Sequence, residues 1–268
     1  MSPRRETDGR RRPRREGSER VALTGTHPIR EALAARRRKL HELVVGPGSE
    51  GDALCSLAEA AGVPVRCEAP GSGRDPDSLP RLEVGPLPEL SLEALAASDT
   101  TGPRMLVALD GVEDPQNLGA IARVAEAAGA AGLLLTQRRA PPLSPAVSRA
   151  SAGAIEWLPV ARVPNLRRAL KLLKDLDFWI FGADPNGTEG LYELPARLRE
   201  GNRVVVLGAE DRGMRQGVAE EVDHRVRIPM AGRIDSLNVA TAAAVLLFEL
   251  GRPTHSVSES QLRRECPE

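Results

Sequence analysis

The feature that most limits the fold is a regular alternation of short apolar segments with helical ones, which begins at Met105. Several apolar segments carry hydrophobic residues at consecutive positions, as in Val204-Val205-Val206-Leu207. A strand with this pattern is buried on both faces, and strands that alternate with helices form a parallel sheet covered on each side. This half of the chain is therefore predicted to be an α/β domain. We predict strands at 105–112, 132–136, 158–163, 177–184, 203–209 and 225–230, with helices at 117–129, 144–155, 165–176, 213–222 and 236–250.

The residues before this alternation predict a smaller α/β unit. A helix is expected to open near His27-Pro28, and strands at 40–45 and 63–68 flank a second helix at 52–61. Residues 70–90 hold five prolines and are predicted to be loop, and 91–104 predicts a short helix and then a linker. We expect these domain bounds: a small domain at 21–97, a linker at 98–104, a larger domain at 105–252 and a C-terminal tail at 253–268.

Composition excludes several classes of protein. No apolar run approaches the roughly 20 residues of a membrane-spanning helix, and no signal segment opens the chain, so we expect a cytoplasmic protein without a membrane partner. Cys55, Cys67 and Cys266 are too scattered for a disulfide framework or a zinc site, and we expect no metal. Six aromatic residues in 268 are too few for a single-strand binder that relies on base stacking.

The formal net charge is zero, but residues 1–20 hold eight arginines against four acids. This head has almost no apolar residue to bury and is predicted to be disordered. It either attracts RNA weakly or is an inert solvated extension. Elsewhere, the run Arg36-Arg37-Arg38-Lys39 is either part of an RNA-binding surface or a solvated helix end.

The segment GPGSEG at 46–51 matches the dinucleotide-binding pattern G-x-G-x-x-G. It follows a predicted strand, precedes a helix, and has Glu68 near the place of a ribose-binding acid. Pro47, however, removes a backbone donor, Asp52 and not an apolar residue follows the last glycine, and only two strands are predicted in this unit. An ordinary strand-loop-helix turn is favoured, and a nicotinamide-dependent enzyme remains a rival hypothesis.

The larger domain carries polar side chains at three turns. The first holds Asn117, Gly119 and Arg123 at N-x-G-x-x-R spacing after Pro115. A helix that opens at Asn117 would point its first N–H groups and the Asn amide at one opening, although Asn117 could equally be a simple N-cap. Arg123 lies roughly 120° around the helix from Asn117, so the two converge only if the cap bends inward.

The second turn, in VVVLGAEDRGM (204–214), places Glu210 at a strand end, where α/β sheets bind ligands. An acid there is expected to be functional or ion-paired, because burying it unpaired is costly. The third turn follows Pro229-Met230. A helix is expected to begin at Ser236 or Leu237, with Asn238 in its first turn, or with Ser236 as a plain N-cap. That helix is apolar almost all round and is predicted to be buried.

In this order and spacing the three segments resemble the SpoU (TrmH-like) RNA ribose 2′-O-methyltransferases of the SPOUT class. The segments 150–166 and GTHPIREAL (25–33) resemble the ribosomal-RNA guanosine branch of that family. The resemblance implies a SPOUT domain with a C-terminal trefoil knot, in which 204–214 and 228–240 enclose S-adenosylmethionine. It also implies a homodimer through the knotted domain and a small N-terminal RNA-binding domain that resembles a ribosomal protein.

The resemblance also assigns site residues. Gly208, Ile228 and Leu237 would contact the cofactor through their backbone, and Leu207 and Met230 would line its apolar pocket. The polar set around the transferred methyl group would be Asn117, Arg123, Glu210, Ser236 and Asn238. The family arginine is often described as the general base, but a guanidinium keeps its proton in proteins. Our hypothesis is that Arg123 pairs with a substrate phosphate, that Glu210 and Asn238 orient Arg123 or the ribose, and that Ser236 offers a hydroxyl contact.

Three departures from the family pattern bear on the site and the target. Asp211 stands where a glycine usually follows the acid, Ala240 stands where a serine is common, and 70–100 lacks the usual His-Gln-Gly stretch. The predicted reaction is methylation of a ribose 2′-hydroxyl, most specifically of a guanosine in large-subunit ribosomal RNA. A transfer-RNA methyltransferase is the nearest alternative. A non-catalytic RNA-binding protein is another, although it would be expected to have lost Asn117, Arg123 or Glu210.

Overall fold

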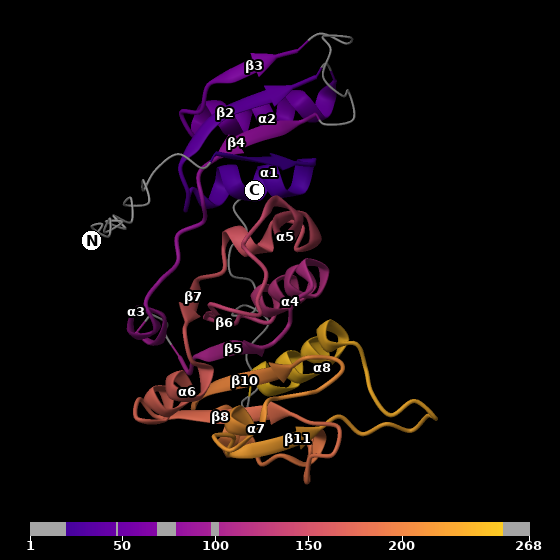
Figure 1. Cartoon of the computed structure of the whole chain (residues 1–268). Coiled ribbons are helices and arrows are strands. Elements are labelled where there is room, and N and C mark those ends of the chain that lie inside the picture. The colour runs from indigo at the N-terminus through magenta and orange to yellow at the C-terminus, as the bar shows by residue number, and fades with distance from the viewer. Residues whose placement is uncertain (1–19, 47, 69–78, 98–101, 254–268) are drawn as a thin grey trace, which may run out of the picture.

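The computed structural model describes residues 20–46, 48–68, 79–97 and 102–253. These residues form two sheets with their helices, and the two sheets lie one beyond the other along an elongated molecule (Figure 1). The predicted disordered head and nearly all of the predicted C-terminal tail lie outside the described residues, as do residues 98–101 of the predicted linker.

The first sheet has four strands in the order β1-β4-β2-β3. Its elements are β1 (Val21–Thr24), α1 (Thr26–Ala35), β2 (Leu40–Val45), α2 (Ser49–Ala60), β3 (Val65–Cys67) and β4 (Arg81–Val84). The prediction of loop throughout 70–90 was wrong for β4, which pairs antiparallel with both β1 and β2. That prediction rested on the five prolines of the segment. None of them lies within β4, and the β4 residues Leu82 and Val84 are fully buried.

The mixed order of this sheet also bears on the G-x-G-x-x-G segment. Only β2 and β3 run parallel across α2, and β4 lies antiparallel on the other side of β2. This arrangement lacks the parallel βαβαβ halves of a dinucleotide-binding fold. Gly51 faces the Gly46 carbonyl oxygen, which would lie 2.9 Å from an added Cβ, so this glycine serves close packing of the loop.

The second sheet has seven parallel strands in the order β7-β6-β5-β10-β8-β11-β9, which confirms the predicted parallel α/β architecture. The strands are β5 (Met105–Asp110), β6 (Gly132–Thr136), β7 (Val160–Val163), β8 (Phe178–Ala183), β9 (Glu189–Gly190), β10 (Asn202–Gly208) and β11 (His224–Arg227). The helices are α3 (Leu92–Ala96), α4 (Pro115–Ala127), α5 (Pro145–Ala150), α6 (Leu166–Lys174), α7 (Gln216–Ala219) and α8 (Val239–Gly251), with short 3-10 turns at Ala154–Glu156, Leu191–Glu193 and Ala196–Arg199.

Successive side chains of the central strands enter two different cores, which explains their continuous hydrophobicity. Val205 and Leu207 pack under α4, α5 and α8, whereas Val204 and Val206 pack under α3, α6 and α7. Each fully buried aliphatic side chain contributes roughly 1.5–3 kcal/mol relative to an exposed one. Burial on both faces fixes the register of β10 between β5 and β8.

Several predicted helix bounds were wrong at turns. The helix expected at 213–222 forms only as α7, and the one expected at 144–155 is split into α5 and the turn at Ala154–Glu156. The split follows from left-handed backbone at Ala152 and Gly153. A Cβ on Gly153 would lie 2.6 Å from the Glu31 side chain, so the break lets the small domain approach closely.

A buried ion pair joins the two domains. The Arg38 side chain donates to both carboxylate oxygens of Glu156, at 2.8 and 2.5 Å, and both side chains are 1% exposed. Ser148 Oγ donates to the same carboxylate. Burial raises the pKa of Glu156, which the attraction of Arg38 opposes. The four-residue basic run is therefore not a uniform RNA-binding surface or solvated helix end, because Arg38 is sealed inside the domain junction.

The segment that follows β4 packs on the second sheet. Leu90 forms a parallel bridge with Ala161, and Leu92, Leu95 and Ala96 belong to the core under α6. The predicted domain ranges stay a prediction. No helix in the described part of the chain is long and apolar enough to cross a membrane.

Candidate functional site

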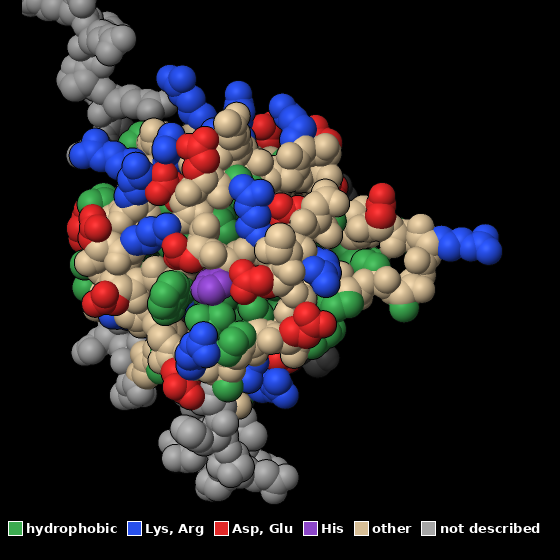
Figure 2. All heavy atoms as spheres, turned by 90° about the horizontal axis from the view of Figure 1, so that it is seen from below, with side chains coloured by type: hydrophobic (Ala, Val, Ile, Leu, Met, Phe, Trp, Pro, Cys, Tyr) green, Lys and Arg blue, Asp and Glu red, His purple; other side chains and the backbone are tan. Residues whose placement is uncertain are grey.

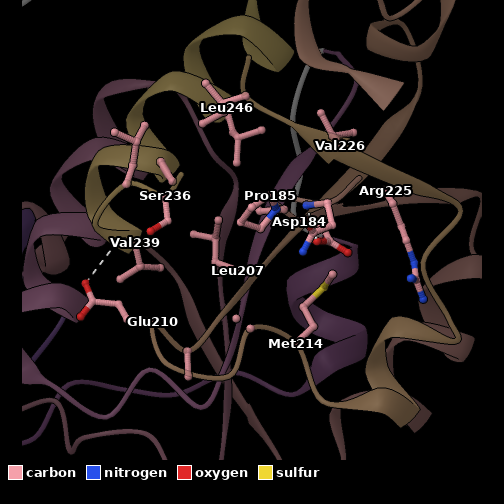
Figure 3. A pocket seen from close by; sticks show the side chains of 18 of the residues that line it. Asp184, Pro185, Leu207, Glu210, Met214, Arg225, Val226, Ser236, Val239 and Leu246 are labelled. Carbon is pink, nitrogen blue, oxygen red and sulfur yellow. Dashed lines mark hydrogen bonds between the residues drawn. The ribbon is translucent and has the colours of Figure 1, made fainter. Parts of the chain in front are cut away.

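A cavity of about 420 Å³ opens at the carboxyl ends of β8, β10 and β11. It is bounded by the turn after β10, by the segment after β11 and by the first turns of α8. Figure 3 shows Leu207, Met214 and Leu246, from three different elements, around one space. All five residues predicted to contact a cofactor line it: Leu207, Gly208, Ile228, Met230 and Leu237.

The turn after β10 is held closed by its own backbone. Ala209 and Gly213 exchange two hydrogen bonds, of 3.1 and 2.8 Å, and Gly213 adopts a left-handed φ of 62°. A Cβ on Gly208 would lie 2.2 Å from the carbonyl carbon of Gly213 and 2.4 Å from the nitrogen of Met214. Only glycine therefore fits at position 208, and the turn forms one rigid wall of the cavity.

The opposite wall leads into α8. The helix begins at Val239, and its N-cap is Asn238, whose Oδ1 accepts from the backbone N–H groups of Ala240 and Thr241. The predicted start at Ser236 or Leu237, and the alternative of Ser236 as the N-cap, were both wrong. Ser236 lines the cavity but is exposed, and its hydroxyl donates to Asp235. An asparagine carboxamide can cap the helix and still donate from its Nδ2.

That Nδ2 joins two of the other predicted residues. It donates to Asn117 Oδ1 at 3.1 Å and to Glu210 Oε1 at 2.5 Å, and Val239 N–H points at the same Glu210 oxygen at 3.4 Å. Asn117, Glu210 and Asn238 come from α4, the turn after β10 and the cap of α8. They form a connected polar group, the Asn117–Glu210–Asn238 cluster, and Glu210 also lines the cavity.

The helix that carries Asn117 begins earlier than predicted. Asp114 is its N-cap and accepts from Gln116 N–H, so Asn117 is not a capping residue and its side chain is free to meet Asn238. Gly119 serves packing, because an added Cβ would lie 2.4 Å from the Cβ of Ala150 in α5. Arg123 is exposed on α4 and does not line the cavity, so the structure does not bring it or Ser236 into the cluster.

An ion pair that the sequence reasoning missed fixes the far end of the turn. Asp110, 1% exposed at the end of β5, accepts from Arg215 backbone N–H at 2.8 Å and from its side chain at 2.7 and 2.5 Å. The sequence does offer a signal for Asp110, because Asp110 is, like Glu210, an acidic residue at the end of a buried strand. Asp184 and Asn186 also line the cavity without having been predicted.

The described residues contain no group of three or more His, Cys, Asp or Glu side chains that could hold a metal ion. The cavity walls combine apolar side chains, a backbone turn with no room for a Cβ, and a polar cluster at one end. Ligand pockets of this size are typically apolar with a few placed polar groups. The arrangement suits a small organic molecule that presents a reactive group toward Glu210 and Asn238.

Two family models match separate parts of the chain. Residues 104–248 match the model of the SpoU rRNA methylase family, and residues 22–67 match that of RNA 2′-O ribose methyltransferase substrate binding. A Staphylococcus aureus protein assigned to the TrmH family of tRNA/rRNA methyltransferases is 40% identical over 151 residues, covering 56% of this chain and 60% of the relative. An uncharacterized tRNA/rRNA methyltransferase of Synechocystis is 42% identical over 174 residues, covering 63% of this chain and 44% of the relative. The chain thus spans less than two thirds of these relatives.

Solved structures resemble the whole described fold. An AdoMet-bound rRNA methyltransferase of Sinorhizobium meliloti is 27% identical with a TM-score of 0.71, covering 89% of this chain and 88% of that one. The SpoU methyltransferase AviRb of Streptomyces viridochromogenes, in complex with AdoMet, has a TM-score of 0.73 at 24% identity, covering 87% of this chain and 90% of that one. The second likeness establishes the fold alone.

Proposed function

Because this chain belongs to the SpoU rRNA methylase family, as its three motifs predict, we propose that it is an S-adenosylmethionine-dependent methyltransferase acting on a ribose 2′-hydroxyl of RNA. The observation that carries the proposal is the position of the cavity. The two segments predicted to enclose the methyl donor line it, and the Asn117–Glu210–Asn238 cluster lies at its rim.

The residues present fit S-adenosylmethionine. The backbone turn at 208–213 packs on itself at Gly208, so it forms a compact wall of the cavity. Leu207, Ile228 and Leu246 offer apolar contact, and Glu210 and Asp184 offer carboxylates to the positively charged parts of the molecule. When bound, S-adenosylmethionine supplies an electrophilic methyl group on a sulfonium sulfur.

The chain's own residues must then orient a weakly acidic hydroxyl and stabilise the negative charge that develops on its oxygen. Asn238 acts indirectly: its Oδ1 caps α8 and its Nδ2 donates to Asn117 and Glu210, so it holds the Glu210 carboxylate in place. Glu210 accepts two hydrogen bonds through one oxygen, which leaves its second oxygen free to accept from a ribose hydroxyl. We assign Asn117 a positioning role through Asn238.

For Arg123 we propose that the guanidinium pairs with a substrate phosphate and stabilises negative charge. Its exposure on α4 fits a role that begins when RNA binds. The planar fork of arginine binds phosphate in a bidentate manner that lysine cannot reproduce. Arg123→Lys is therefore expected to lower turnover at least about tenfold while S-adenosylmethionine affinity stays unchanged. Near-full turnover of this variant would refute a role for the planar guanidinium of Arg123.

We further propose that the larger domain contains a C-terminal trefoil knot and that the chain forms a homodimer through this knotted domain. The return of the chain after β11, which places α8 against α4 and β10, supports this proposal (Figure 1). Phe248 on α8 is 56% exposed and Ile234 in the preceding segment 71% exposed, and large apolar side chains left in solvent favour a partner surface. Sedimentation would report a dimer, and a monomer at micromolar concentration would contradict it.

The target that we propose is a guanosine of large-subunit ribosomal RNA, with transfer RNA as the second candidate. The resemblance of the 150–166 segment to the ribosomal-RNA branch of the family supports ribosomal RNA. This segment also contacts the small domain through Glu156 and through Trp157, whose Nε1 donates to Glu31 at 2.8 Å. We also propose a cytoplasmic location, since the reaction acts on RNA. Mapping of ribose methylations in a deletion strain tests both targets: one lost position is expected in large-subunit ribosomal RNA. Loss in transfer RNA would favour the second candidate, and an unchanged profile in both RNAs would refute the function.

A further inference from the structure

A second cavity, of about 440 Å³, lies beside the first and has a different chemistry. It opens at the carboxyl ends of β6 and β7, where the loops that follow these strands meet the segment leading into α7. Its wall contains four arginines and no carboxylate, and we call it the arginine pocket. Its lining includes Thr136, Arg138, Arg139, Arg167 and Arg215.

Two of the four arginines already have acidic partners. Arg215 is bound to buried Asp110, and Arg167 pairs with Glu220 and Glu221 at 3.0 and 2.8 Å. Among the described residues, no carboxylate pairs with Arg138 or Arg139. The pocket therefore has uncompensated positive charge. On the lower face of the molecule, by contrast, basic and acidic side chains lie interspersed (Figure 2).

The loop that carries Arg138 and Arg139 is braced. Thr136 Oγ1 donates to the Arg138 carbonyl at 2.5 Å, and Arg162 on β7 donates to the carbonyls of Thr136 and Pro141. Arg139 adopts a left-handed φ of 62°, which is uncommon for a residue with a side chain. The loop backbone is thereby fixed, so only the exposed side chains of Arg138 and Arg139 have to be ordered when an anion binds.

The pocket also lies next to the proposed site of methyl transfer. Arg212, Gly213 and Met214 line the first cavity, whereas Arg215 and Val218, which follow directly, line the arginine pocket. Helix α7 thus separates the two cavities. Arg215 lines the arginine pocket only, but its backbone N–H and side chain bind Asp110, which ends β5 beside Gly208 in the wall of the first cavity.

We propose that the arginine pocket binds a phosphate of the RNA backbone next to the ribose that is methylated. The inference rests on the proposed function and assigns Arg138 and Arg139 a role in positioning RNA. Guanidinium groups bind phosphate oxygens through charge-assisted, often bidentate hydrogen bonds. Phosphate contacts fix the register of a nucleic acid without reading its sequence. A chain with few aromatic side chains has to place RNA mainly through such contacts.

The test measures binding of large-subunit ribosomal RNA by filter retention over a series of salt concentrations. Arg138→Gln with Arg139→Asn removes both charges, and asparagine tolerates the left-handed backbone at position 139. RNA affinity is expected to fall at least about tenfold. The slope of log affinity against log salt should decrease by about 0.7–0.9 for each phosphate contact that is lost. S-adenosylmethionine affinity, measured by calorimetry, should stay unchanged.

Two variants serve as controls. Arg197→Gln removes one positive charge from an exposed arginine that precedes β10, at the amino end of that strand, whereas the arginine pocket lies at carboxyl ends; it should leave the salt slope unchanged. Arg138→Lys keeps the charge and should retain most of the slope while losing part of the affinity. Both variants should unfold in urea at the midpoint of the wild type.

Three results would overturn the proposal. The double variant could show the salt slope of the wild type, or Arg197→Gln could lose as much RNA affinity as the double variant does. The third is that the wild type binds inorganic phosphate tightly while the double substitution leaves RNA affinity unchanged. The last result would identify a small-anion site. Failure of the proposed function would look different, because the wild type would then bind no S-adenosylmethionine whatever the arginine variants do to RNA.

Discussion

Removal of the Glu156 carboxylate is the perturbation with the largest expected effect on the joint between the two domains. In Glu156→Ala the Arg38 guanidinium would keep its charge at 1% exposure but lose the two carboxylate contacts at 2.8 and 2.5 Å. What remains to Arg38 is the Gly85 carbonyl at 3.3 Å and Ser148 Oγ at 3.4 Å. A buried charge whose partner is removed costs about 3–5 kcal/mol, a large part of a typical stability of about 5–15 kcal/mol.

The assay is urea unfolding with a double-mutant cycle. Glu156→Ala is expected to lose about 3–5 kcal/mol, as are Arg38→Met and Glu156→Leu, the two single variants of the cycle. The double variant Arg38→Met with Glu156→Leu should lie within about 1–2 kcal/mol of the wild type, because apolar residues of similar volume replace such pairs well. The coupling free energy between the two positions should therefore be large. A single variant that loses less than about 1 kcal/mol, or a double variant as unstable as the single one, would refute the reasoning.

Three further predictions concern the walls of the cofactor cavity. Gly208→Ala should lower the unfolding free energy by about 1–3 kcal/mol and abolish S-adenosylmethionine binding in calorimetry, because its Cβ has no room in the turn; binding at wild-type affinity would contradict this. Asp110→Asn should release the Arg215 side chain, speed amide hydrogen exchange at 209–215 and weaken cofactor binding several-fold; unchanged exchange would argue against a bracing role. Gly119→Ala should cost about 1–3 kcal/mol through its clash with α5 yet leave cofactor affinity intact, and a selective loss of affinity would show that Gly119 serves the site directly.

The sequence predicted the parallel sheet well because burial on two faces leaves a clear pattern. Residues 204–207 could only be a central strand, and the alternation of their side chains between two cores follows from strand geometry. The short interior strand β4 was missed, because only its own four residues carry the signal and proline-rich sequence surrounds it. A four-residue strand is defined by its pairing with β1 and β2 more than by its own composition.

Helix caps were predicted less well, for a physical reason. The residues Asp114 and Asn117, or Ser236 and Asn238, are all competent caps. Which one serves depends on where the backbone turns, and tertiary packing sets that position. The consequence is functional: Asn238 is the cap, and this fixes its Nδ2 against Asn117 and Glu210. The residue set came from the family resemblance, and its geometry came from the structure.

The long-range ion pairs could not be predicted from sequence patterns. Arg38 belongs to a run of basic residues that is typical of a solvated surface. Its partner Glu156 lies 118 positions further along the chain. Asp110 and Arg215 are separated by 105 positions. Their individual residue types carry no signal of pairing, because only the completed fold brings the charges together and removes them from water.

The most direct test of the central claim is methyl transfer followed by alkaline hydrolysis. RNA from a strain that lacks the gene is incubated with the protein and S-adenosylmethionine that carries tritium in its methyl group. A 2′-O-methyl ribose has no free hydroxyl to attack the neighbouring phosphate, so the account predicts tritium in alkali-stable dinucleotides, and none with Gly208→Ala. Absence of transfer, or tritium released in mononucleotides as expected for base methylation, would contradict it.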